Sequence, residues 1–104
     1  MLNTTLTDLK QRTARGIALV DFDVPWCASS RIQERIIESL ARRYSECAWV
    51  AAVDVDRIQN IAVKFNIHHV PTLVLFKEGR EVRRFIGLQS EETLETAIQT
   101  LLNP

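Results

Sequence analysis

The chain is poor in the residues that mark specialised folds. Its 104 residues include only two cysteines, three glycines and three prolines, and 46% of them are hydrophobic. Two cysteines are too few for a disulfide scaffold or a four-cysteine zinc site. Low glycine and proline exclude collagen-like and low-complexity sequences. At this length we expect one domain, residues 1–104, built around one hydrophobic core.

The sequence also lacks an excess of charge and any long apolar run. Lysine plus arginine number 13, aspartate plus glutamate number 13, and the formal net charge is +0. Such a chain has no basic surplus to attract nucleic acid or anionic lipid. No apolar run approaches the ~20 residues of a membrane helix, and residues 1–12 lack the apolar core of a signal peptide. We therefore expect a cytoplasmic protein that binds neither nucleic acid nor membranes.

Hydrophobic periodicity predicts alternating helices and strands. Apolar residues at helical spacing predict helices at residues 4–13, 28–44, 56–65 and, after Ser90, 91–102. Short β-rich runs predict strands at residues 17–22, 48–55, 72–76 and 82–86, the last two joined by a turn at 77–80. Helix caps are expected at Thr5, Asp56 and Ser90. This order predicts an α/β fold in which a mixed sheet of four or five strands is flanked by helices on both faces, residues 2–4 being the candidate fifth strand.

Four short segments, in order along the chain, resemble those of a known family. They are residues 20–27 (VDFDVPWC), residues 53–56 (VDVD), residues 70–73 (VPTL) and the hairpin glycines Gly79 and Gly87. Through them nearly the whole chain resembles thioredoxin. The resemblance implies the thioredoxin fold, thiol–disulfide exchange with protein disulfides and a cis peptide bond before Pro71. It also implies that no metal or organic cofactor is needed, with thioredoxin reductase or glutathione as electron donor.

The sequence departs from the family at the reactive motif itself. The family has Trp-Cys-Gly-Pro-Cys, whereas residues 26–30 read Trp-Cys-Ala-Ser-Ser, so a serine replaces the second cysteine. Asp23 and Ala52 stand where the family has an aromatic residue and a lysine. Ser30 is either an engineered replacement or the mark of a natural one-thiol member, and the sequence alone does not separate these origins.

Cys27 is the candidate nucleophile because it immediately precedes the long helix. Unsatisfied N–H groups and the helix dipole at a helix start favour a thiolate, and a thiolate attacks a disulfide to give a mixed disulfide. Ser30 occupies the position of the resolving cysteine and cannot release the product. We expect its hydroxyl to neighbour Cys27 and to be placed to donate a hydrogen bond to the thiolate. The alternative is a buried, inert cysteine.

Two acids and a second cysteine complete the candidate residues. Asp21 lies within an apolar run, and the resemblance makes it a carboxylate buried beneath the reactive site, where burial raises its pKa. It serves either as a proton relay or as a structural carboxylate. Asp23 adds negative charge near the thiol and has no assigned role. Cys47 precedes the second strand, so we expect it at the opposite end of the sheet from Cys27, out of disulfide reach, as a small packing residue.

The resemblance further implies an apolar docking surface beside the thiol. The loop before Pro71 faces Cys27 and presents the Val70 backbone to an extended substrate. His69 either approaches Cys27 as a proton donor or metal ligand or, like His68, faces solvent. The predicted surface consists of Trp26, Val55, His69, Val70, Pro71, Ile86 and Gly87.

Three functions fit these residues. The first is thiol–disulfide exchange by a monomer through Cys27. The second is a redox-inactive thioredoxin-fold module that binds a peptide or partner subunit beside Pro71. The third, an iron–sulfur carrier of the monothiol glutaredoxin type, fits less well, because the Gly-Phe pair after the cysteine and a glutathione-binding signature are absent from the sequence.

Overall fold

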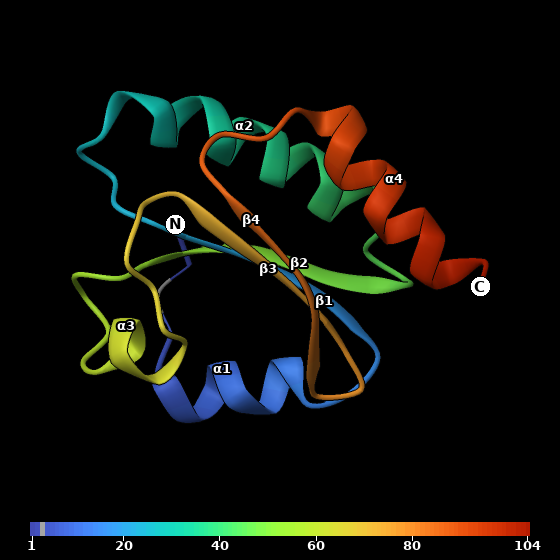
Figure 1. Ribbon diagram of the computed structural model, residues 1–104, viewed down its shortest axis with the longest axis horizontal. Coiled ribbons are helices and arrows are strands. Elements are labelled where there is room, and N and C mark those ends of the chain that lie inside the picture. Colours follow the sequence, from blue (N-terminus) through green and yellow to red (C-terminus); the bar gives the residue numbers. More distant parts are fainter. Residues whose placement is uncertain (3) are drawn as a thin grey trace.

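The structure of the protein is a computed structural model that describes residues 1–2 and 4–104. Over these residues the chain forms four helices and four strands (Figure 1). Their bounds are α1 Leu6–Thr13, β1 Ile17–Asp23, α2 Ala28–Arg43, β2 Ala48–Asp54, α3 Ile61–Lys64, β3 Thr72–Lys77, β4 Arg80–Ile86 and α4 Glu91–Leu102. The predicted α/β class and element order are confirmed.

The sheet is mixed and has β1 near its centre. Its strand order is β2-β1-β3-β4 over the described residues; β1 runs parallel to β2 and antiparallel to β3, and β3 pairs antiparallel with β4. Of the candidate fifth strand at residues 2–4, Leu2 makes one parallel bridge to Val53, while Asn3 lies outside the described residues.

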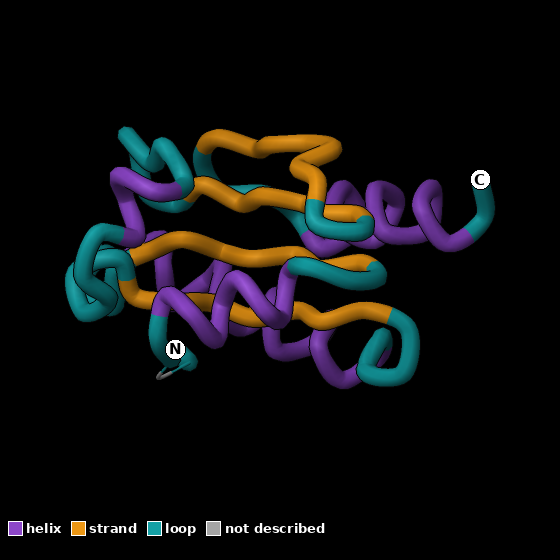
Figure 2. The backbone as a smooth tube through the Cα atoms, turned by 90° about the horizontal axis from the view of Figure 1, so that it is seen from below, coloured by secondary structure: helices purple, strands orange, loops and turns teal. Residues whose placement is uncertain are grey.

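Helices cover both faces of this sheet. Figure 1 shows α2 and α4 on one side and α1 and α3 on the other, and Figure 2, turned by 90°, shows the strands side by side between them. Each face has its own buried apolar cluster. The cluster under α2 and α4 includes Leu19, Ile37, Leu40, Leu73, Leu94 and Ile98. The cluster under α1 and α3 includes Leu9, Val20, Phe22, Val53, Ile61 and Val74.

Strand β1 places its two acids on the same face of the sheet. Side chains alternate between faces along a strand. Leu19 belongs to the cluster under α2 and α4, whereas Val20 and Phe22 belong to the cluster under α1 and α3. Asp21 and Asp23 therefore share the face of Leu19 and lie under α2.

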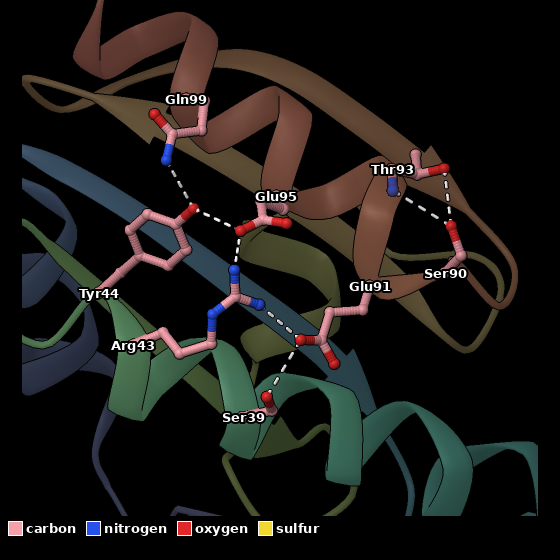
Figure 3. A network of polar contacts seen from close by, with 8 residues as sticks. All are labelled: Ser39, Arg43, Tyr44, Ser90, Glu91, Thr93, Glu95 and Gln99. Atoms are coloured by element: carbon pink, nitrogen blue, oxygen red, sulfur yellow. Dashed lines mark hydrogen bonds and ion pairs between the residues drawn. The ribbon is translucent and has the colours of Figure 1, made fainter.

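A polar network joins the end of α2 to α4, as Figure 3 shows. Arg43 pairs with Glu91 (Nη1 to Oε2, 2.6 Å) and also with Glu95. Ser39 donates a hydrogen bond to Glu91 (3.1 Å), and the hydroxyl of Tyr44 donates to Glu95 (3.0 Å). Exposed pairs of this kind each contribute ~0–1 kcal/mol, so the network mainly fixes how the two helices sit against each other.

Two of the three predicted helix caps are confirmed and one is wrong. Thr5 accepts a hydrogen bond from the backbone N–H of Asp8, and Ser90 accepts one from that of Thr93, each at 3.1 Å. Asp56 caps no helix, because the chain leaves β2 through a turn in which the Asp54 side chain accepts from the Asp56 N–H. Helix α3 consequently begins only at Ile61.

The β3–β4 hairpin turns more tightly than predicted. Glu78 (φ 52°) and Gly79 (φ 83°) both adopt positive φ, which is the backbone of a two-residue hairpin turn. Strand β4 therefore begins at Arg80 instead of residue 82. The hairpin ends at Ile86, and Gly87, with φ 90°, leads the chain away from the sheet.

Candidate active site

Cys27 lies at the start of α2, where the sequence predicted it. It is the N-cap residue, with an extended backbone, and its carbonyl oxygen accepts the N–H of Ser30 at 3.1 Å. Its side chain is half-buried, and its sulfur lies 3.5 Å from the hydroxyl oxygen of Ser29. The first turn of the described helix carries no acidic side chain. The positive end of the helix therefore acts on this sulfur without a local negative charge in that turn.

The loop around Pro71 lies at the same end of the sheet. Thr72 is paired with Phe22, so the start of β3 is beside the end of β1, from which the chain runs on to Cys27. The Val70–Pro71 peptide bond is cis, as the resemblance implied. Pro71 is buried, Val70 is half-buried, and the Pro71 carbonyl oxygen accepts the N–H of Gly87 at 2.8 Å.

The end of β2 lies at this same end of the sheet. The N–H of Val55 donates to the carbonyl oxygen of Asp23 at 2.9 Å, and the indole N–H of Trp26 donates to Asp56 at 3.2 Å. Trp26 is 73% exposed and Ile86 is 56% exposed, while Val55 is half-buried. Large apolar side chains thus stay open to solvent around the segment that carries Cys27.

The two histidines before the Pro71 loop are exposed. One ring nitrogen of His68 lies 2.7 Å from the side-chain oxygen of Asn66, and the backbone carbonyl of His69 accepts a hydrogen bond from Thr72 at 2.6 Å. This arrangement agrees with the expectation that both rings face solvent. Among the described residues, no group of three or more His, Cys, Asp or Glu side chains is placed to hold a metal ion.

Among the described residues, the hydroxyl of Ser30 makes its hydrogen bonds with groups other than the sulfur of Cys27, to which we expected it to donate. This hydroxyl lies 2.6 Å from Oδ1 of Asp23 and also contacts the carbonyl oxygen of Val24, and the residue is fully buried. The sequence-based expectation treated residues 27 and 30 as neighbours on one helix face. Ser30 instead turns under the helix toward the end of β1, because acceptors are available there. The serine beside the sulfur of Cys27 is Ser29.

Asp21 is a buried carboxylate, as the sequence predicted. It has 0% of its surface exposed, and no group among the described residues hydrogen-bonds either of its oxygens. Burial, followed by the negative charges of Asp23 and Glu34, raises the pKa of Asp21 to about 8. Its partner across the β1–β2 ladder is Ala52, so this position supplies no compensating cation.

Asp23 is a site residue to which the sequence analysis assigned no role. It is fully buried, and its Oδ1 accepts hydrogen bonds from the N–H of Val24 (2.8 Å) and from Ser30. Burial raises the pKa of Asp23, and the two hydrogen bonds partly offset that effect. The spacing of two residues from Asp21 in one strand was the available signal, because it places both acids on one sheet face.

Cys47 is not the packing residue that we predicted. It is exposed, in the turn between α2 and β2, where its N–H donates to the carbonyl oxygen of Tyr44. The predicted separation from Cys27 agrees with the strand register, because Ile17 is paired with Ala48 at one end of the sheet and Asp23 with Asp54 at the other. Both cysteines, which lie within the described residues, are free thiols.

A mixed four-stranded sheet between two helical layers, with a thiol at a helix start and a cis-proline loop at the same sheet edge, defines a protein of the thioredoxin-fold class. The family described as Thioredoxin matches residues 3–100. The chain belongs to the thioredoxin family, whose members carry out thiol–disulfide exchange with protein disulfides.

Individual relatives agree with this assignment. The thioredoxin of Staphylococcus aureus is 32% identical over 94 residues, which cover 90% of each chain. A mutant thioredoxin from Halobacterium salinarum superposes with a TM-score of 0.86 at 35% identity, covering 94% of this chain and 86% of that one. Fasciola hepatica thioredoxin superposes with a TM-score of 0.79 at 34% identity, covering 93% and 94%. Over the described residues, no helix is long and apolar enough to cross a bilayer.

Proposed function

We propose that the chain exchanges disulfides with protein substrates through Cys27 and forms a mixed disulfide that Ser30 cannot resolve. The observation that carries this proposal is the position of Cys27, a half-buried free thiol at the N-cap of a 16-residue helix. A thiolate there attacks one sulfur of a substrate disulfide. A new bond forms to Cys27, the substrate disulfide breaks, and the other substrate sulfur leaves as a thiolate that takes up a proton.

The surroundings of Cys27 supply the docking surface in this proposal. An extended substrate segment pairs with the backbone of Val70 beside Pro71, in the manner of an added strand. Exposed Trp26 and Ile86 contribute apolar contact on either side. The full proposed surface is Trp26, Val55, His69, Val70, Pro71, Ile86 and Gly87.

The second half of the cycle requires thiols from outside the chain. An external thiolate attacks the sulfur of Cys27, forms a new mixed disulfide with it and releases the substrate as a thiol. A second external thiolate then attacks the sulfur of the first, which joins the two external thiols in a disulfide and frees Cys27. Two external thiols are oxidised while one substrate disulfide is reduced, so atoms and electrons balance. Glutathione or a thioredoxin reductase is the proposed donor, and we expect the protein, one domain of residues 1–104, to act as a monomer without a cofactor.

Asp21 is proposed to hold a proton beneath this site. Its pKa of about 8 keeps the carboxyl largely protonated at neutral pH. A neutral acid adds no negative charge under α2, so it does not oppose a thiolate at Cys27. The burial of Asp21 thus keeps a negative charge away from the sulfur of Cys27, although burying an acid that has no hydrogen-bond partner among the described residues costs stability.

A second candidate function is partner binding without redox turnover. The observation that favours it is the exposure of Trp26 and Ile86 in a chain whose position 30 has no thiol. The same surface would then hold a peptide through apolar contacts and backbone pairing, and Cys27 would take no part. The two functions differ in whether a covalent bond forms at Cys27.

Incubation with insulin whose disulfides are intact, followed by acid quench and intact-mass analysis, tests the proposal. We expect a covalent adduct of the wild-type chain with an insulin chain, its loss in C27S, its retention in C47S, and its release on addition of glutathione. Insulin reduction without added thiol should be slight. Binding without an adduct in the wild-type chain would favour the partner-binding function instead.

A further inference from the structure

A buried hydrogen bond couples position 30 to position 23. Oγ of Ser30 lies 2.6 Å from Oδ1 of Asp23 and also contacts the carbonyl oxygen of Val24. Ser30 and Asp23 both have 0% of their surface exposed. A hydroxyl carries one proton, so it serves one of these oxygens at a time. The contact ties the first turn of α2 to the end of β1, directly under the segment that carries Cys27.

The charged side chains of β1, β2 and α2 around the pair are acidic. Asp21 shares the strand face of Asp23, and Asp54 is the register partner of Asp23 on β2. Glu34 of α2 adds negative potential at both β1 acids, and its own carboxylate is paired with the N-terminal ammonium of Met1 at 2.5 Å. The adjacent start of β3, at Thr72, is uncharged. Among the described residues, the hydrogen-bond donors to Asp23 are an N–H and a hydroxyl, both neutral. A further negative charge at this place is opposed by burial and by the negative charges of Asp23, Asp54 and Glu34, whereas Asp21 is largely protonated at neutral pH and adds none.

We propose that Asp23 disfavours a resolving thiol at position 30. Ser30 then has a structural role, and the mixed disulfide on Cys27 is released only by an external thiol. This inference rests on the proposed exchange at Cys27 and adds the control of its second step. A resolving cysteine must become a thiolate before it attacks. At position 30 that thiolate would be buried against a carboxylate, whereas a serine hydroxyl donates to the same carboxylate.

The proposal makes positions 23 and 30 interdependent, with Asp23 as a positioning residue that acts through position 30. A cysteine introduced at position 30 alone should meet the acid of Asp23 and resolve slowly. Neutralising Asp23 at the same time should release it, because asparagine keeps the shape and removes the charge. Each pH unit by which the carboxylate raises the pKa of the new thiol lowers its thiolate fraction about tenfold at neutral pH.

The test measures release of a small thiol from Cys27. All chains carry C47S, so that Cys27 is the residue first loaded with an aromatic disulfide whose thiol is coloured when set free. S30C is compared with S30C plus D23N. In either chain the thiolate at position 30 attacks the sulfur of Cys27, forms an intramolecular disulfide and expels the coloured thiol. We expect release at neutral pH to be at least about tenfold faster in the double variant, with S30C reaching the same rate only at higher pH.

The outcomes separate this inference from the proposed exchange. If Cys27 in the Ser30 chain cannot be loaded, the exchange function itself fails. If it loads but S30C and the double variant release at equal rates, or differ by the same factor at every pH, only the role of Asp23 is overturned. Circular dichroism checks the fold of each chain. S30C plus D23A replaces the asparagine variant if that one unfolds, with the same expected shift of the pH profile.

Discussion

Substituting Asp21 with asparagine should change how the stability of the protein depends on pH. The folded state holds the Asp21 proton up to about pH 8, whereas the unfolded chain loses it near the ordinary value of 3.8. The stabilisation from that proton is therefore fully present below the unfolded pKa and is lost as pH rises toward the folded pKa. The loss amounts to about 1.4 kcal/mol for each pH unit in this window, or roughly 3 kcal/mol between about pH 5 and about pH 7.

D21N should lack this component, since its amide does not ionise. Urea unfolding of both proteins across this range measures the effect. We expect the unfolding free energy of D21N relative to wild type to rise by roughly 3 kcal/mol from about pH 5 to about pH 7, a relative midpoint shift of about 1–3 M urea. E46Q, at an exposed carboxylate, is the matched control and should follow wild type. Parallel curves for wild type and D21N would show that Asp21 ionises in the folded protein much as it does in the unfolded chain.

Two further substitutions test the stability of α4, one at its cap and one in the core beneath it. S90A removes the oxygen that accepts the N–H of Thr93 at the start of α4. It should lower the unfolding free energy by about 1 kcal/mol and the Tm by about 4–8 °C, and S90D is the control that keeps a cap. An unchanged Tm in S90A would mean that the cap contributes nothing. L94A deletes a fully buried side chain between α4 and the sheet, and should cost about 2–5 kcal/mol in chemical unfolding; a cost near zero would contradict tight packing there.

Local signals in the sequence were enough to predict most of the fold. The apolar run from Ile17 predicted β1 because a strand buried on both faces needs apolar side chains throughout. Thr5 and Ser90 were recognisable as caps because each is a hydroxyl residue directly before a helical pattern. The cap is also local, since each accepts the N–H of the residue three positions later. The order of elements followed from these pieces, and the family resemblance joined them into one topology.

Contacts between distant residues were beyond such local reasoning. Asp56 had the spacing of a helix cap, but its N–H donates to the side chain of Asp54, so Asp56 lies in a turn and not at a helix start. Cys47 was expected to pack, yet it falls in a turn and is exposed. These errors arose because the burial and the hydrogen-bond partners of a residue depend on its neighbours in space, and a local sequence pattern does not show which residues those are.

The candidate site shows the same division. The helix start fixed the place of Cys27, and the apolar run marked Asp21 as a buried acid. The orientation of Ser30 depends on Asp23, seven residues earlier and on another element. Helical spacing led us to expect a hydrogen bond from Ser30 to Cys27, whereas the hydroxyl bonds to the carboxylate at the end of β1.

The reactivity of Cys27 relative to Cys47 tests the central claim most directly. Both thiols belong to one chain, and the more exposed of them, Cys47, lies away from any helix start, so it is an internal control. Alkylation with iodoacetamide at neutral pH, followed by peptide mass analysis, gives both rates in one sample. A helix N-terminus contributes up to ~2 kcal/mol, so we expect Cys27 to react about 5- to 30-fold faster despite its partial burial. Faster reaction of Cys47 would contradict an activated thiol at Cys27.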